Sequence, residues 1–258
     1  MALLELRSVT KQFGGLMAVR DVSFTVEPGM VLSIIGPNGA GKTTLFNLIT
    51  GVYKPTRGDI VWNGKSIAGL RSYQIARLGI GRTFQIVKPF PNLTILENVM
   101  AGAFARTNSL AEARKEALEI LEFTGLLSRK DQLAKNLTLG GRKRLEVARS
   151  LATRPQIVLL DEVVAGLNPT ETEETIELIK SLKSRGVSAV AGVEHVMRVV
   201  MSLSDRIVVI HHGEKIAEGT PEVISRDRRV IEAYLGEDYA QEARPREAGP
   251  QESGVSHG

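Results

Sequence analysis

The order of hydrophobic and polar positions predicts that the first quarter of the chain is rich in strands. "LLELRSV" (residues 3–9) and "VRDVSFTV" (19–26) have the composition of strands, and the second alternates up to the turn "EPG". "VLSII" (31–35) is a short apolar run ended by glycine, which favours a buried strand. "GDIVWNG" (58–64) is a strand closed by an Asn-Gly turn. We therefore expect an antiparallel β part at the N-terminus.

The pattern changes to a helical one in the middle of the chain. Leu110, Ala113, Ala117 and Leu121 recur at helical spacing, with charged residues between them. We interpret residues from about 86 to 153 as an inserted helical subdomain.

Strands and helices alternate in the last part of the folded chain. "QIVLLDE" (156–162) predicts another buried strand, and "SAVAGV" and "DRIVVIHHGEKIAEG" predict further ones. Between them, Asn168, Pro169 and Glu171 form the start signal of a helix. We expect an α/β fold with a mixed β core over residues 1–238, and a disordered polar tail over 239–258.

Composition narrows the class of protein. The 258 residues include no cysteine, which excludes disulfides and thiolate chemistry. The net charge is +4, but no block of Lys and Arg stands out, so we expect no nucleic-acid partner. No signal peptide and no run of about 20 apolar residues is visible, which predicts a cytoplasmic protein that only partners could hold at a membrane.

The segment "GPNGAGKTT" carries the clearest chemistry. It fits G-x-x-x-x-G-K-[ST], with a predicted strand before it and a helix after it. Glycines let backbone N–H groups curve around phosphates, and the N-terminus of the helix adds positive potential. Lys42 is expected to meet the β- and γ-phosphates, and the Thr43 hydroxyl to bind Mg²⁺. This motif alone leaves kinases, GTPases and ATPases open.

Two adjacent carboxylates favour hydrolysis. Asp161 ends the apolar strand and can hold the Mg²⁺ shell, while Glu162 can polarise the attacking water. Taken alone, this pair could equally begin a solvated loop. His195 could reach the γ-phosphate, Gln85 could contact Mg²⁺ or the attacking water, and Phe13 could stack on a nucleotide base. Taken alone, however, each residue type is more common at core or surface positions without a function.

A second candidate anion site lies far from the first. Thr138 precedes Gly140 and Gly141 at the start of the basic, apolar-periodic segment "GRKRLEVARS". A hydroxyl residue and glycines in front of such a segment are typical of a helix N-terminus that holds an anion.

Together, these elements resemble the ATP-binding subunits of ABC transporters over about residues 3–237. "GPNGAGKTT" is similar to Walker A, "IVLLDE" to Walker B, "FQ" to the Q-loop, "AGLN" to the D-loop and "EH" to the switch histidine. The resemblance implies Glu162, His195 and Gln85 as catalytic, and Thr43, Gln85 and Asp161 as Mg²⁺-binding. It also implies ATP contacts from Phe13, Gly36, Pro37, Asn38, Gly39, Ala40, Gly41, Lys42, Thr43 and Thr44.

In this family, two ATPase domains close head to tail, and each signature loop meets the nucleotide of the opposite subunit. The segment Thr138, Leu139, Gly140 and Gly141 resembles that LSGGQ signature. Leu139 and Gly141 replace the usual glycine and glutamine, so the glutamine side chain that would contact the partner's nucleotide is missing, and the strength of that half-site stays open.

Further segments, such as "GRTFQIVKPFPNLTILENV" and "VIEAYLGED", resemble the ATPases of branched-chain amino-acid importers. The implied partners are permease subunits, a second ATPase subunit and, indirectly, a periplasmic binding protein. Related importers of urea or amides and a lipopolysaccharide exporter remain open. So do a non-catalytic nucleotide switch and, less compatible with a single phosphate loop, an ABC protein of DNA repair or translation.

Overall fold

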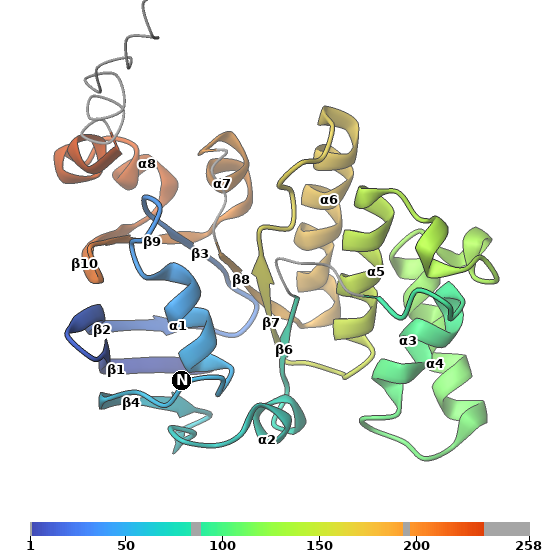
Figure 1. Ribbon diagram of the computed structural model, residues 1–258. Coiled ribbons are helices and arrows are strands. Elements are labelled where there is room, and N and C mark those ends of the chain that lie inside the picture. The colour runs from blue at the N-terminus through green and yellow to red at the C-terminus, as the bar shows by residue number, and fades with distance from the viewer. Residues whose placement is uncertain (1, 84–88, 193–196, 235–258) are drawn as a thin grey trace, which may run out of the picture.

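The computed structural model describes residues 2–83, 89–192 and 197–234, which form two sheets flanked by helices (Figure 1). One sheet is antiparallel, in the order β2-β1-β4-β5. Its strands are β1 (Leu4–Phe13), β2 (Leu16–Val26), β4 (Arg57–Trp62) and β5 (Lys65–Ser66). The predicted antiparallel N-terminal part is therefore confirmed.

The second sheet has the order β10-β9-β3-β8-β7-β6, and only β10 runs antiparallel to its neighbour. Because the other five strands are parallel, their carboxyl ends meet at one edge, where ligands of such sheets bind. The strands are β3 (Val31–Ile35), β6 (Ile80–Arg82), β7 (Ile157–Asp161), β8 (Ser188–Gly192), β9 (Arg206–His211) and β10 (Glu214–Gly219).

Helices cover both faces of this sheet. Helix α1 (Lys42–Ile49) and the antiparallel sheet share one core with Ile157 and Leu159 of β7, whereas Val158 and Leu160 point into the other. Alternate residues of one strand thus enter separate cores, as expected for a strand buried on both faces. The other helices are α2 (Ser72–Arg77), α3 (Ile95–Ala103), α4 (Leu110–Phe123), α5 (Leu139–Leu151), α6 (Pro169–Ser181), α7 (Met197–Leu203) and α8 (Pro221–Ile224).

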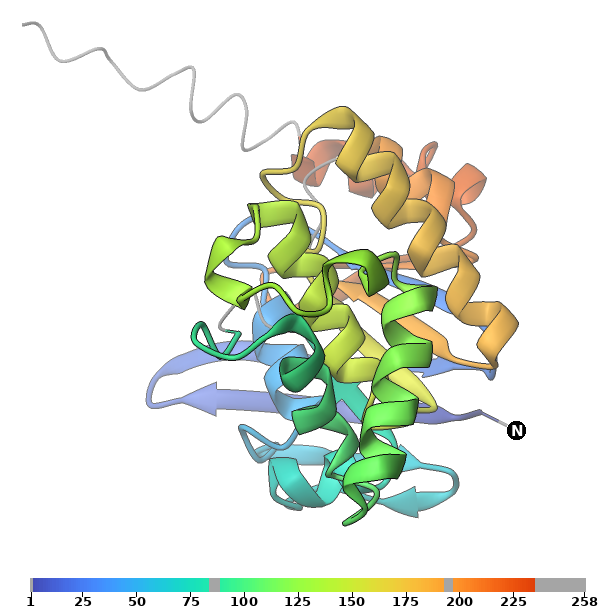
Figure 2. The ribbon, with the colours of Figure 1, turned by 90° about the vertical axis from the view of Figure 1, so that its right-hand side faces the viewer.

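Helices α3, α4 and α5 gather on the side of the molecule away from β1 and β2 (Figures 1 and 2). They lie within the range that the sequence predicts to be helical. Ala113, Ala117 and Leu121 are buried as the spacing predicts, but Leu110 is 66% exposed because it is the first residue of α4. Residues 235–258 lie outside the described part, so the domain end at 238 and the disordered tail stay predictions.

Candidate functional site: the phosphate loop and two carboxylates

The phosphate loop connects β3 to α1 at the carboxyl edge of the parallel sheet. Gly36 has φ 151°, and a Cβ there would lie 1.9 Å from the Ile210 carbonyl oxygen. Gly41 has φ 105°, and a Cβ there would lie 2.4 Å from the carbonyl oxygen of Ala18. Both positions therefore require glycine, for conformation and for space.

Lys42 is the first residue of α1, and its side chain folds back over the loop. Its Nζ donates to the carbonyl oxygens of Gly36 (2.5 Å) and Pro37 (2.6 Å), and the residue is buried. Within the described residues, no side chain caps the N-terminus of α1 and no acidic residue lies in its first turn. The first N–H groups of α1 and the positive end of the helix are thus suited to an anionic ligand.

An open cavity of about 530 Å³ is lined by residues of the loop, and Glu162 also lines it. Phe13, at the end of β1, also borders the cavity, and its ring lies edge-on to Tyr53 with 5.0 Å between centroids. The lining consists of Phe13, Leu16, Met17, Ala18, Asn38, Gly39, Ala40, Gly41, Lys42, Thr43, Thr44, Glu162, His212 and Gly213.

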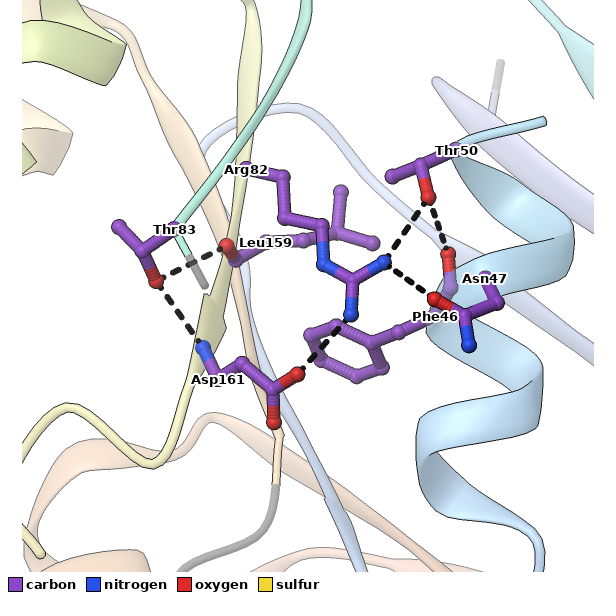
Figure 3. Close-up of polar contacts among 7 residues, drawn as sticks. All are labelled: Phe46, Asn47, Thr50, Arg82, Thr83, Leu159 and Asp161. Atoms are coloured by element: carbon purple, nitrogen blue, oxygen red, sulfur yellow. Dashed lines mark hydrogen bonds and ion pairs between the residues drawn. The ribbon is translucent and has the colours of Figure 1, made fainter. Parts of the chain in front are cut away.

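Asp161 lies at the end of β7 and is buried. Its Oδ2 accepts a hydrogen bond from Arg82 Nη2 at 3.0 Å, and the two side chains are 2% and 9% exposed (Figure 3). Burial raises the pKa of the Asp161 carboxyl above 3.8, and the Arg82 guanidinium opposes that rise without cancelling it. Desolvation therefore outweighs the ion pair here.

Glu162 follows directly but has different surroundings. Its φ of 49° lies in the left-handed region, which costs a residue other than glycine about 1–2 kcal/mol. Lys143 Nζ, from α5, donates to the carbonyl oxygens of Glu162 (2.5 Å) and Ala165 (2.6 Å). These two bonds tie the turn that carries Glu162 to helix α5.

The signature segment is not part of this cavity. Thr138 is the N-cap of α5 and accepts a hydrogen bond from the Gly141 N–H at 3.2 Å. Leu139 is 47% exposed, and a Cβ on Gly140 would lie 2.5 Å from Glu171 Oε1 at the start of α6. Thr138, Leu139, Gly140 and Gly141 are absent from the cavity lining, so they face a different part of the surface.

The sequence-predicted residues thus fall into three groups. The loop, Phe13 and Glu162 meet at one cavity, Asp161 lies buried beside it, and the signature lies elsewhere. Gln85 and His195 lie outside the described residues. Sequence reasoning missed Arg82 and Lys143, although an arginine at the end of the buried strand "GIGR" was a usable signal.

The oxygen donors at the site suit Mg²⁺. Thr43 is exposed and lines the cavity, Asp161 directly precedes the lining residue Glu162, and both supply hard oxygen ligands. Within the described residues, no group of three or more His, Cys, Asp or Glu is gathered for a metal. A hydroxyl and a carboxylate fit Mg²⁺, which proteins usually bind through one or two carboxylates together with substrate phosphates.

The strand, loop and helix around Lys42 have the geometry of a P-loop nucleotide-binding protein. Comparison with known proteins agrees. The model of the ABC transporter family matches residues 19–165, and that of branched-chain amino acid ATP-binding cassette transporters matches residues 214–240.

Individual relatives cover nearly the whole chain. The high-affinity branched-chain amino acid transport ATP-binding protein LivG of Escherichia coli is 44% identical, over 91% of this chain and 98% of that protein. The lipopolysaccharide export system ATP-binding protein LptB of Haemophilus influenzae is 35% identical, over 93% of this chain and 99% of that protein. The crystal structure of a nucleotide-free ATP-binding cassette from an ABC transporter superposes with a TM-score of 0.83. The two sequences are 31% identical, and the match covers 91% of this chain and 99% of that one.

The chain therefore belongs to the ATP-binding subunits of ABC transporters, which couple ATP hydrolysis to transport. No helix within residues 2–83, 89–192 and 197–234 combines the length and the apolar character that crossing a membrane requires.

Proposed function

We propose that this chain is the ATPase subunit of an importer of branched-chain or related amino acids. The observation that carries the proposal is that Glu162 and the phosphate loop line the same cavity. A binding protein needs only the loop, whereas hydrolysis also needs a group that can polarise water. The match of residues 214–240 to branched-chain amino acid transporters supports the cargo class.

Each site residue has a proposed role. The loop from Gly36 to Thr44 binds the phosphates of ATP, and Phe13 stacks on the adenine. Thr43 and Asp161 hold Mg²⁺, which neutralises charge on the phosphates. Glu162 polarises the attacking water, and Gln85 and His195 sense the γ-phosphate.

Catalysis requires a second ATPase subunit, placed head to tail. The signature from Thr138 to Gly141 then completes the partner's site, which agrees with its absence from the cavity of its own chain. Thr138 presents a hydroxyl at the N-terminus of α5, and the partial positive charge of that terminus favours the partner's phosphate.

A groove whose lining includes Ile80 and Gly81 of β6 is proposed to receive a cytoplasmic helix of a permease subunit. Its volume is about 360 Å³, and Val52, Ile75 and Phe90 give it apolar walls. The Arg149 guanidinium, also in the wall, lies 4.9 Å from the centre of the Phe90 ring. The permease would hold the chain at the inner membrane face, and a periplasmic binding protein would deliver the cargo.

Transport by the assembled complex tests the cargo. Vesicles that contain this chain and its permease should accumulate labelled leucine when ATP is supplied on the ATPase side. Uptake of urea or amides instead, or extraction of lipopolysaccharide, would replace the amino-acid proposal with one of its alternatives. Transport without phosphate release would identify a nucleotide switch.

Mixed dimers test the head-to-tail arrangement. Lys42→Ala in one copy and Thr138→Arg in the other should damage the same composite site and leave the second intact. Both changes in one copy should damage both sites and leave less hydrolysis. Equal phosphate release by the two arrangements, with dimers verified, would contradict reciprocal sites. If the physiological partner is a different ATPase, the Thr138 change is placed at that partner's signature hydroxyl.

A further inference from the structure

Arg82 links helix α1 to Asp161 through hydrogen bonds, and the proposed function gives it no role. It closes β6 and pairs in register with Leu159 of β7. Its guanidinium reaches α1 on one side and Asp161 on the other (Figure 3). Nη1 donates to Asn47 Oδ1 at 2.7 Å and to Thr50 Oγ1 at 3.1 Å, while Nη2 donates to Asp161 Oδ2 at 3.0 Å.

The surroundings make this bridge rigid. The Arg82 and Asp161 side chains are 9% and 2% exposed, and the guanidinium carbon lies 5.7 Å from the centre of the Phe46 ring. A planar guanidinium that meets acceptors on both sides has little freedom to turn. Arg82 therefore fixes the position of Asp161 relative to α1, the helix that begins with Lys42.

We propose that Arg82 is a positioning residue for Asp161: it holds Oδ2 so that the other carboxylate oxygen is presented to the Mg²⁺ that accompanies ATP. That second oxygen points away from the guanidinium in Figure 3. The inference rests on the proposed role of Asp161 in holding Mg²⁺. Groups that orient a metal ligand in this way commonly change metal affinity by about 10–100-fold when they are removed.

Charge and geometry make opposite contributions at this position. A cation beside Asp161 repels Mg²⁺, so loss of the charge alone would favour the metal. The planar guanidinium, in contrast, orients the Asp161 carboxylate through its hydrogen bonds, so loss of this geometry alone would weaken metal binding. Arg82→Lys separates these effects because lysine keeps the charge but cannot bridge Asp161 and α1 in the same way.

The experiment is a Mg²⁺ titration of the binding of a non-hydrolysable ATP analogue to the purified full chain. For Arg82→Lys we expect the half-saturating Mg²⁺ concentration to rise about tenfold. Binding of the analogue in excess EDTA should stay within about twofold of wild type, because the loop contacts remain. Arg154→Lys, a change in an arginine that pairs with Glu116 Oε1 at 2.7 Å, is the matched control and should leave the titration unchanged.

Three outcomes would overturn the proposal. An unchanged titration would remove the positioning role, and a lower Mg²⁺ requirement would mean that Arg82 competes with the metal. An equal loss of binding with Mg²⁺ and in EDTA would indicate general damage to the site. If Arg82→Lys does not fold, Asn47→Ala decides: a rise of about threefold supports the bridge, and no change overturns it.

Asp161→Asn separates this inference from the proposed function. If that variant titrates like wild type, the proposed role of Asp161 fails. If analogue binding by Asp161→Asn no longer responds to Mg²⁺ while Arg82→Lys titrates like wild type, only the positioning role of Arg82 fails.

Discussion

Asp161 and Glu162 are neighbours in the chain, yet their surroundings differ. Asp161 ends a buried strand and is paired with Arg82, whereas Glu162 lies on a left-handed turn at the edge of the open cavity. One is held through its side chain, and the other through its backbone by Lys143. We propose a division of labour on this basis: the fixed Asp161 carboxylate suits a metal, and Glu162, which lines the cavity, suits the attacking water.

The largest effect is expected for Glu162→Gln, which removes the proposed water-polarising carboxylate and leaves Asp161 in place. Glutamine has nearly the same shape but cannot act as a base, so hydrolysis should fall about 10²-fold or more. ATP binding and its dependence on Mg²⁺ should persist, because the loop and Asp161 are unchanged, and an ATP-bound dimer should accumulate. Phosphate release and nucleotide binding measure these effects. Turnover equal to wild type would remove Glu162 from its role.

An intermediate effect is expected for Lys143→Met, which removes the two bonds to the Glu162 turn. The two carbonyl groups are partly buried, and the loss of two such hydrogen bonds should cost about 1–3 kcal/mol, which urea unfolding would detect. Displacement of Glu162 should also slow hydrolysis about tenfold.

Arg144→Met provides the control for Lys143, since it lies on the same helix and loses a partly exposed ion pair with Glu174. Such surface pairs contribute about 0–1 kcal/mol, and the hydrolysis rate should not change. Equal effects in the two variants would show that the Lys143 bonds to this turn are not special.

The smallest effect is expected for the stability of Asp161→Asn. Burial raises the pKa of Asp161 in the folded chain, so the folded state binds the proton more tightly than the unfolded state. The contribution of Asp161 to stability is therefore complete below 3.8 and is lost as the pH rises through the raised pKa. Relative to wild type, the variant should therefore gain stability as the pH rises above 3.8.

Urea unfolding of both proteins over a pH series that starts below 3.8 and extends to about 8 measures this difference. If wild type instead becomes more stable relative to Asp161→Asn as the pH rises, the ion pair with Arg82 outweighs burial in setting the pKa of Asp161.

Local sequence signals predicted much of the framework. The Asn63-Gly64 turn is confirmed, with φ of 47° and 77°, and so is the capping box of Asn168 and Glu171 on α6. Both depend on residues close in the chain, for which a short pattern is sufficient. Helical spacing alone does not show where a partner surface ends, and Leu110, the first residue of α4, is exposed.

The sequence by itself determined the phosphate loop, because Gly36, Gly41 and Lys42 act through the backbone and charges of one short segment. It also determined that two carboxylates follow a buried strand. Only the tertiary structure decided that Asp161 pairs with Arg82, 79 residues away, and that Lys143 holds the Glu162 turn from 19 residues away. Such contacts depend on how strands and helices pack, because a long-range hydrogen bond needs two distant backbones in register, and no local pattern encodes that.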